Sequence, residues 1–148
     1  MNIKRSIITV GLAIIAVVLL VSCDESSDSY IGIVNFTEGV ADDSGLVYLD
    51  VTAKNFGNGS AREVSCLITV TETRSDTVLT ETTALFSKGM IIEPDEEVTE
   101  RVQLLYSPAT LDALIEYEEV TNADGTTEKV PLEPIIDRQF EFSWEEVQ

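Results

Sequence analysis

The stretch that decides the fold, residues 47–70, reads VYLDVTAKNFGNGSAREVSCLITV. Apolar residues occupy every second position of its first half, namely Val47, Leu49, Val51 and Ala53. The same two-residue period returns in its second half, at Val64, Cys66, Ile68 and Val70. This period is typical of half-buried β-strands. Residues 55–60 lie between the two halves and are turn formers that tolerate positive φ. The stretch therefore predicts two consecutive strands joined by a turn.

Further short strands are predicted on both sides of this stretch. They cover residues 30–36, 77–86, 98–106, 115–121, 126–132 and 140–144. Residues 38–45 are predicted to form a loop, and Ser107 followed by Pro108 predicts a helix of one or two turns that ends by Leu114. Short strands at intervals of roughly ten residues, without a long helix or a repeat, are typical of a β-sandwich. We therefore expect an all-β fold, a single sandwich of about seven to eight strands.

Residues 115–132 predict a hairpin around the turn sequence NADG at positions 122–125. Its strands carry four glutamates and few core-sized residues, so we expect an exposed edge. Pro131 and Pro134 would protect this edge against pairing with foreign strands.

A resemblance to a known family covers residues 47–70 followed by residues 91–106, IIEPDEEVTERVQLLY. These segments resemble small immunoglobulin-like modules of prokaryotic cell surfaces, such as the bacterial cell-adhesion-related domain. The shared features are a strand ending in Asn-x-Gly, an alternating partner strand, and a turn with proline before a late strand. Two features depart from the family: Pro94-Asp95 replaces a proline-glycine turn, and the hairpin of residues 115–132 is additional. The resemblance implies an immunoglobulin-like sandwich without an active site and, loosely, adhesion, scaffolding or assembly.

The N-terminus predicts secretion. A basic start, MNIKR, precedes an apolar run over residues 7–21, which is short of the ~20 residues that a membrane-spanning helix needs. Such a pattern is typical of a signal peptide. Its end, Leu20-Val21-Ser22-Cys23, resembles the lipobox of bacterial lipoproteins. That resemblance implies cleavage between Ser22 and Cys23 and long acyl chains, such as palmitate, on Cys23. The alternative is a plain signal anchor with an ordinary cysteine.

These observations divide the chain into three segments. Residues 1–22 are the predicted lipoprotein signal peptide, residues 23–29 the lipidated cysteine and a flexible acidic and serine-rich linker, and residues 30–148 the sandwich domain. The expected location is the cell envelope, where the lipid on Cys23 would hold the protein on a bacterial membrane, facing the periplasm or the exterior.

The predicted mature chain is strongly acidic. Without residues 1–22 it has seven basic and 27 acidic residues, a net charge of −20. This charge argues against nucleic acid as a partner, because phosphates would be repelled. The acids are spread along the chain, which favours a solvated surface. The alternative is a surface that binds a cation or a basic partner.

The sequence contains few residues suited to catalysis. The chain has no histidine, which excludes Ser-His-Asp triads, Cys-His pairs and histidine metal sites. Cys66 lies in an apolar run and is predicted to be a small buried hydrophobe. A Cys23–Cys66 disulfide would be possible only if the lipobox interpretation fails. Phe140, Phe142 and Trp144 alternate with polar residues and are predicted to be core, although an aromatic stripe can also bind sugar.

No cofactor is predicted. Asp42 and Asp43, in an acidic loop, are the candidate ligands for calcium, which prefers oxygen donors. We expect a membrane-tethered, non-catalytic lipoprotein that acts as a protein-interaction or structural module, with another envelope protein as its partner. The alternatives are a lipoprotein that binds calcium, another cation or a small ligand, and a hydrolase that depends on carboxylates.

Overall fold

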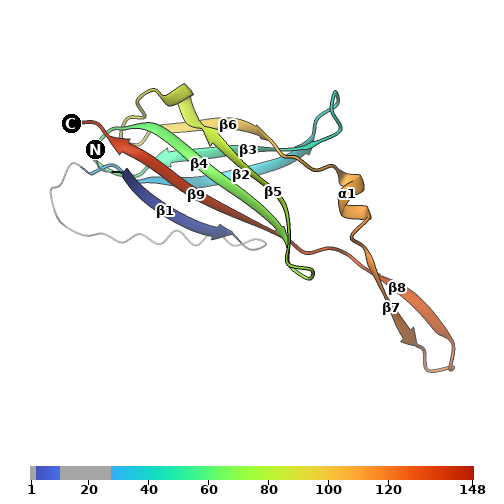
Figure 1. Ribbon diagram of the computed structural model, residues 1–148. Helices are drawn as coiled ribbons and strands as arrows, with labels where there is room; N and C mark the ends of the chain where they lie inside the picture. The colour runs from blue at the N-terminus through green and yellow to red at the C-terminus, as the bar shows by residue number, and fades with distance from the viewer. Residues whose placement is uncertain (1–2, 11–27) are drawn as a thin grey trace.

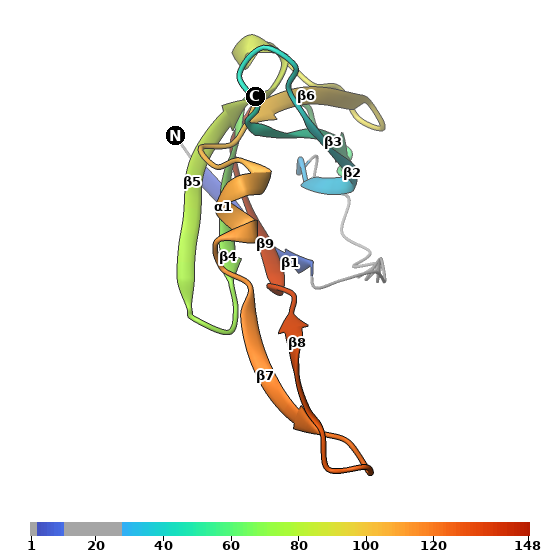
Figure 2. The same cartoon turned by 90° about the vertical axis from the view of Figure 1, so that its right-hand side faces the viewer.

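The computed structural model describes residues 3–10 and 28–148, which fold into two antiparallel sheets facing each other across one core and a separate hairpin (Figures 1 and 2). The order of strands in the first sheet is β1 (Ile3–Val10), β9 (Ile136–Glu146), β4 (Ala61–Glu72) and β5 (Thr77–Leu85). The order in the second sheet is β2 (Ile31–Val40), β3 (Val47–Asn55) and β6 (Glu97–Gln103). The fold is mostly β, as the sequence predicted.

The stretch of residues 47–70 forms β3 and β4, and these two strands belong to different sheets. The turn between them therefore carries the chain from one sheet to the other. β3 throughout, and β4 from Val64 onward, bury every second residue because each turns its apolar face toward the same core.

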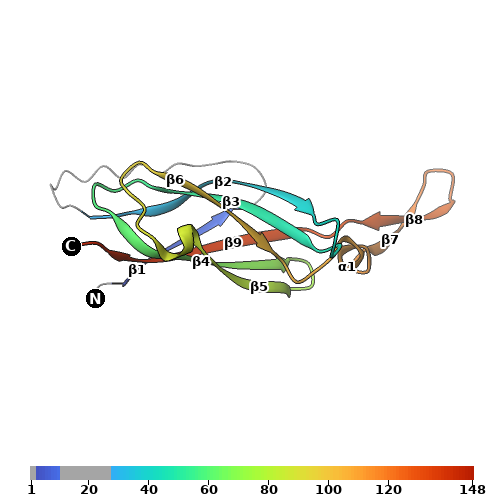
Figure 3. The ribbon, with the colours of Figure 1, turned by 90° about the horizontal axis from the view of Figure 1, so that it is seen from above.

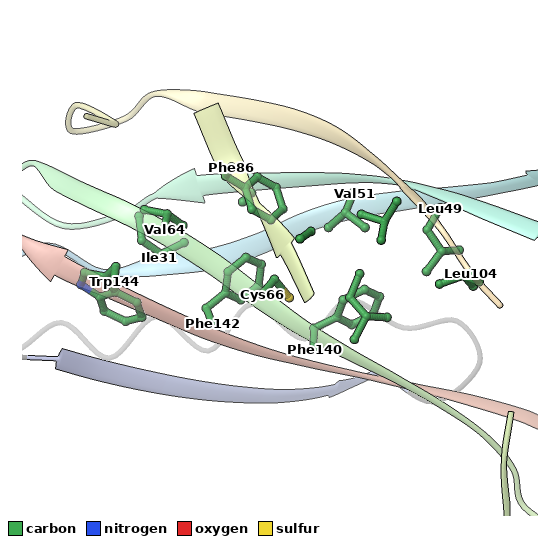
Figure 4. Close-up of a cluster of buried hydrophobic side chains, with 14 of the residues drawn as sticks. Ile31, Leu49, Val51, Val64, Cys66, Phe86, Leu104, Phe140, Phe142 and Trp144 are labelled. Carbon is green, nitrogen blue, oxygen red and sulfur yellow. The ribbon is translucent and has the colours of Figure 1, made fainter. Parts of the chain in front are cut away.

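Aromatic side chains of β9 fill the middle of the core (Figure 4). Phe140 and Phe142 are fully buried and Trp144 is nearly so, which confirms the prediction that this stripe is core. The ring of Phe140 lies 5.2 Å from that of Phe36, and the ring of Phe142 lies 5.8 Å from that of Phe86. Cys66 is buried beside them with a free thiol, as predicted, and its burial raises the pKa of the thiol to about 12.

Some boundaries differ from the sequence prediction. β2 continues to Val40, into the predicted loop of residues 38–45, because Glu38, Gly39 and Val40 pair with β3. β9 begins at Ile136, since its first four residues pair with β4. Ladder hydrogen bonds thus extend both strands into polar sequence that lacks a strand pattern. A short 3₁₀ turn, η1 (Phe86–Gly89), follows β5.

The predicted short helix and the predicted hairpin are both confirmed. The helix α1 (Pro108–Asp112) begins after Ser107, which forms a capping box with Thr110. β7 (Glu116–Thr121) and β8 (Thr127–Leu132) then form the predicted hairpin.

The predicted leader lies partly outside the described residues. Residues 3–10 form β1 along the outer edge of β9, whereas residues 11–27, with Ser22 and Cys23, are not described. Among the described residues, no helix is both long enough and apolar enough to cross a bilayer.

Candidate interaction surface

The domain is elongated, and its two ends carry different features (Figures 1 and 3). At one end lie the start of β2, the β3–β4 turn and the C-terminus; we call this the tether end. At the other end lie α1 and the hairpin of residues 116–132, which projects beyond the sandwich and which we call the arm. The cartoon turned by 90° shows the same projection of the arm (Figure 2).

Contacts to Trp144 fix where the chain enters the fold at the tether end. The indole Nε1 of Trp144 donates a hydrogen bond of 2.9 Å to Oγ of Ser29, which is buried. The ring of Tyr30 lies edge-on to the indole, with centroids 6.3 Å apart. Ser29, the last residue of the predicted linker, therefore lies inside the fold.

The side chain of Asn55 joins the segments that meet at the tether end. This fully buried amide donates from Nδ2 to the carbonyls of Gly59 (2.8 Å) and Ile92 (3.1 Å). Its Oδ1 accepts hydrogen bonds from the backbone N–H groups of Tyr30 (3.2 Å) and Gly57 (3.0 Å). Every hydrogen-bonding position of the amide is used by a backbone group.

Sequence reasoning gave residues 55–60 a different role, as turn formers that tolerate positive φ. The predicted turn is confirmed, because residues 56–60 join β3 to β4, but no described residue within it has a positive φ. A signal was present: Asn55 continues the series of buried positions 47, 49, 51 and 53. A polar residue at a buried position of a strand must find partners, and Asn55 finds them in the backbone.

The arm is exposed on both faces, and its register defines what each face presents. Directly opposite residues of an antiparallel pair share a face. Residues on one face are Glu116, Glu118, Val120, Glu128, Val130 and Leu132. The other face carries Tyr117, Glu119, Lys129 and Pro131, and Tyr117 is 64% exposed. Each face therefore combines apolar side chains with carboxylates.

The tip of the arm is a tight turn over residues 122–125. The backbone N–H of Asn122 donates to the carbonyl of Thr126 (2.8 Å), and Gly125 supplies a positive φ of 84°. Oδ1 of Asp124 accepts from the hydroxyl of Thr126 (2.6 Å) and from its N–H (2.9 Å), which lowers the pKa of Asp124. These contacts shape the tip, but an isolated two-stranded hairpin is only marginally stable in water.

Glu72 holds the root of the arm to the sandwich. Its carboxylate is buried and accepts hydrogen bonds from the hydroxyl (2.7 Å) and N–H (2.7 Å) of Ser75, and from the N–H groups of Arg74 (3.1 Å) and Ile135 (3.2 Å). The last bond ties the end of β4 to the segment between β8 and β9. These donors, the Ser75 hydroxyl foremost, lower the pKa of Glu72 to about 2.

Acid should weaken this attachment. The pKa of Glu72 is about 2 in the fold and 4.5 in a model peptide, so its stabilising effect is complete above pH 4.5 and is lost as the pH falls toward 2. We expect Glu72→Gln to lower the melting temperature at pH 7 and to reduce the dependence of that temperature on pH between 4.5 and 2. Thermal melting of both proteins across this range, with Glu119→Gln on the exposed arm as control, measures the effect. Equal pH profiles for wild type and Glu72→Gln would contradict it.

Two shallow hollows flank α1 at the root of the arm. The first is lined by Glu72, Arg74, Ser75 and residues 113–116, and the second by Pro108, Leu111, Asp112, Glu133, Pro134 and Ile136. The carboxylate of Glu72 is already engaged by four donors in the first hollow. A general acid would need a raised pKa, whereas hydrogen bonds lower that of Glu72.

The other residues singled out from the sequence do not come together. Asp42 and Asp43 lie in the exposed β2–β3 turn, and the described part of the chain contains no group of three or more side chains suited to a metal ion. Asp50, on the outer face of β3, is held by Arg101 through two hydrogen bonds of 2.7 Å, which lower its pKa. Arg101 also stacks on Tyr48, its guanidinium 4.0 Å from the ring centre.

Comparison with known proteins adds little. No family model matches the chain, and no curated protein matches it. Among solved structures, a crystal structure described as "Putative ApaA Protein from Bordetella pertussis" aligns with 73% of this chain and 92% of its own, at 14% identity and a TM-score of 0.33. A similarity this low supports no argument about fold or function.

Proposed function

We propose that the protein is a lipid-anchored, non-catalytic lipoprotein of the bacterial envelope that binds another envelope protein through its arm, and that residues 30–148 form an immunoglobulin-like sandwich. The observation that carries this proposal is the placement of the arm at the end of the domain opposite the tether end, where the described chain resumes at Asp28 (Figure 1).

The small number of residues between Cys23 and the domain supports an orientation with the tether end toward the membrane. The carbonyl of Asp28 accepts hydrogen bonds from the N–H groups of Asn58 (3.0 Å) and Gly59 (3.2 Å), so the chain joins the fold at that residue. Only residues 24–27 then separate Cys23 from the domain, with a root-mean-square reach of roughly 11 Å. The 11 residues of β9 span about 35 Å toward the arm. The tether end would sit close to the membrane and the arm well above it.

The chemistry of the arm suits a protein partner. Tyr117 is 64% exposed, and exposed tyrosine is a frequent anchor of protein interfaces. Neighbouring glutamates on both faces favour a partner surface that combines apolar with basic groups. The described carboxyl groups whose pKa values are shifted, Asp50, Glu72 and Asp124, are all shifted downward, which supports a role other than acid catalysis.

The tether is tested by comparing wild type with Cys23→Ala in a bacterial host. We expect the wild type to lose residues 1–22, to gain the mass of two or three acyl chains and to sediment with membranes, since each buried methylene contributes ~0.8 kcal/mol. The Cys23→Ala variant should gain no lipid mass. Intact mass and membrane fractionation measure both outcomes. Identical behaviour of the two proteins would contradict the lipid anchor.

The arm is tested by photo-crosslinking in the native host. A photoreactive residue replaces Tyr117 in one protein and Leu105, which is 71% exposed but lies outside the arm, in another. We expect a discrete crosslinked product from position 117 alone, and less of it in the Cys23→Ala background. The same products from both positions, or hydrolase activity of the purified mature protein, would count against the proposal.

A further inference from the structure

The outer edge of β9 is paired in the full chain by β1 alone, among the described residues. Residues 3–10 belong to the predicted signal peptide, so cleavage after Ser22 would remove β1 and leave this edge open. We propose that, in the mature protein, the outer edge of β9 binds an extended segment of a partner protein as an added β-strand. This inference rests on the proposed function, because the edge opens only if the leader is removed.

The shape of β9 supports this role. The strand has 11 residues, contains no proline, and pairs with all eight residues of β1 without a register shift. Edge strands of soluble proteins are normally blunted by short length, bulges, proline or inward charges. The other edges show such features, whereas the part of β9 that pairs with β1 has one charged residue on its core-facing side, Arg138, which is paired with Glu38 of β2.

Each competing edge is interrupted or short. β2 has a register shift between Ile33 and Asn35, and the pairing of β5 with β4 shifts between Val70 and Thr71. β6 has only seven residues, and β8 contains Pro131. By contrast, β9 offers a long and regular ladder of backbone groups, which is the geometry that strand addition requires.

The two faces of β9 define the chemistry of the added strand. Phe140, Phe142 and Trp144 point into the core, so the residues opposite them should be small or apolar. Gln139, Glu141, Ser143 and Glu145 occupy the other face, and its carboxylates favour basic residues in the partner. Glu145 is already paired with Arg62 of β4, at 3.2 Å.

The register of β1 follows this rule in part. Ile8 stands opposite Phe140, and Arg5 stands opposite Ser143, as the rule requires. Lys4 opposite Trp144 and Ile7 opposite Glu141 depart from it. A second copy of this chain suits the edge less well. Antiparallel pairing of two β9 strands would bring glutamates of both copies to the same face, and two mature chains each carry a net charge of −20.

The probe is a synthetic peptide of residues 3–10, Ile-Lys-Arg-Ser-Ile-Ile-Thr-Val, added to the mature lipoprotein purified in detergent from membranes. The chain has one tryptophan, Trp144, which lies on β9, so its fluorescence reports binding. Intact mass first establishes whether residues 1–22 are gone. Hydrogen exchange then shows whether amides of β9, and not those of β6, gain protection.

Two N-methylated peptides are the matched controls. Alternate residues of an antiparallel strand direct their N–H groups toward the partner strand, and the residues between them direct theirs away. Methylation of one alternate set should therefore weaken binding at least tenfold, whereas methylation of the other set should leave it within about twofold.

The outcomes separate this inference from the proposed function. A mature protein that retains residues 1–22 overturns both. If the leader is gone but the peptide does not bind, or both N-methylated peptides bind equally, the β9 inference alone is overturned and the lipoprotein remains. If the mature protein is a dimer that the peptide dissociates, a second copy of this chain occupies the edge of β9, and the proposal of a strand from a different protein is overturned.

Discussion

Replacing Asn55 with alanine is expected to lower the free energy of unfolding by about 3–5 kcal/mol. The amide satisfies four backbone groups, the carbonyls of Gly59 and Ile92 and the N–H groups of Tyr30 and Gly57. Alanine would leave them without their partner in a site where Asn55 is fully buried. Each unsatisfied buried group costs about 1–3 kcal/mol, and water entering the vacated space offsets part of the sum.

Urea denaturation of the variants measures this loss. Asn55→Asp tests the donors separately, because it keeps an acceptor for Tyr30 and Gly57 but removes both N–H donors and buries a charge. It should be at least as destabilising as alanine at pH 7. Asn58→Ala, an exposed position in the same turn, is the control and should change stability by less than about 0.5 kcal/mol. Similar losses for Asn55→Ala and Asn58→Ala would contradict this role.

Local periodicity explains how much of the fold could be predicted. The alternation of residues 47–70 placed β3 and β4 correctly, because a strand that is buried on one face has an apolar residue at every second position. It could not reveal that the two strands lie in different sheets, since strand order depends on pairings distant in sequence. The partners of Asn55 show the same limit, because Ile92 lies 37 residues away.

The hairpin that forms the arm could also be predicted from local sequence, but its attachment to the sandwich and its position at one end could not. Turn residues at 122–125 between short strands are sufficient to predict a hairpin. Its attachment through Glu72 depends on Ile135, 63 residues away in the sequence. The separation of the arm from the tether end follows from the course of β9, which no local pattern encodes.

Replacing Gly57 with alanine should have the second large effect, a loss of about 2–3 kcal/mol. A Cβ at this position would lie 2.3 Å from the carbonyl oxygen of Asp28 and 2.5 Å from the backbone nitrogen of Tyr30. Backbone atoms cannot rotate away as side chains do, so the incoming segment of residues 28–30 must move. The hydrogen bonds from Asn58 and Gly59 to Asp28 would weaken with it.

Gly32→Ala is the matched control, because its nearest neighbour would be the ring of Phe56, at 3.2 Å, which is free to shift. Urea denaturation should separate the two variants, and hydrogen exchange at Asn58 and Gly59 should accelerate in Gly57→Ala alone. Equal stability and equal exchange in both variants would contradict the close approach. If Cys23 carries the proposed lipid, release of residues 28–30 would lengthen the segment between Cys23 and the fold from four to seven residues, and the reach expected of a flexible chain from roughly 11 to 15 Å. Gly57 therefore sets both the stability of the tether end and the distance that the proposed anchor allows between the domain and the membrane.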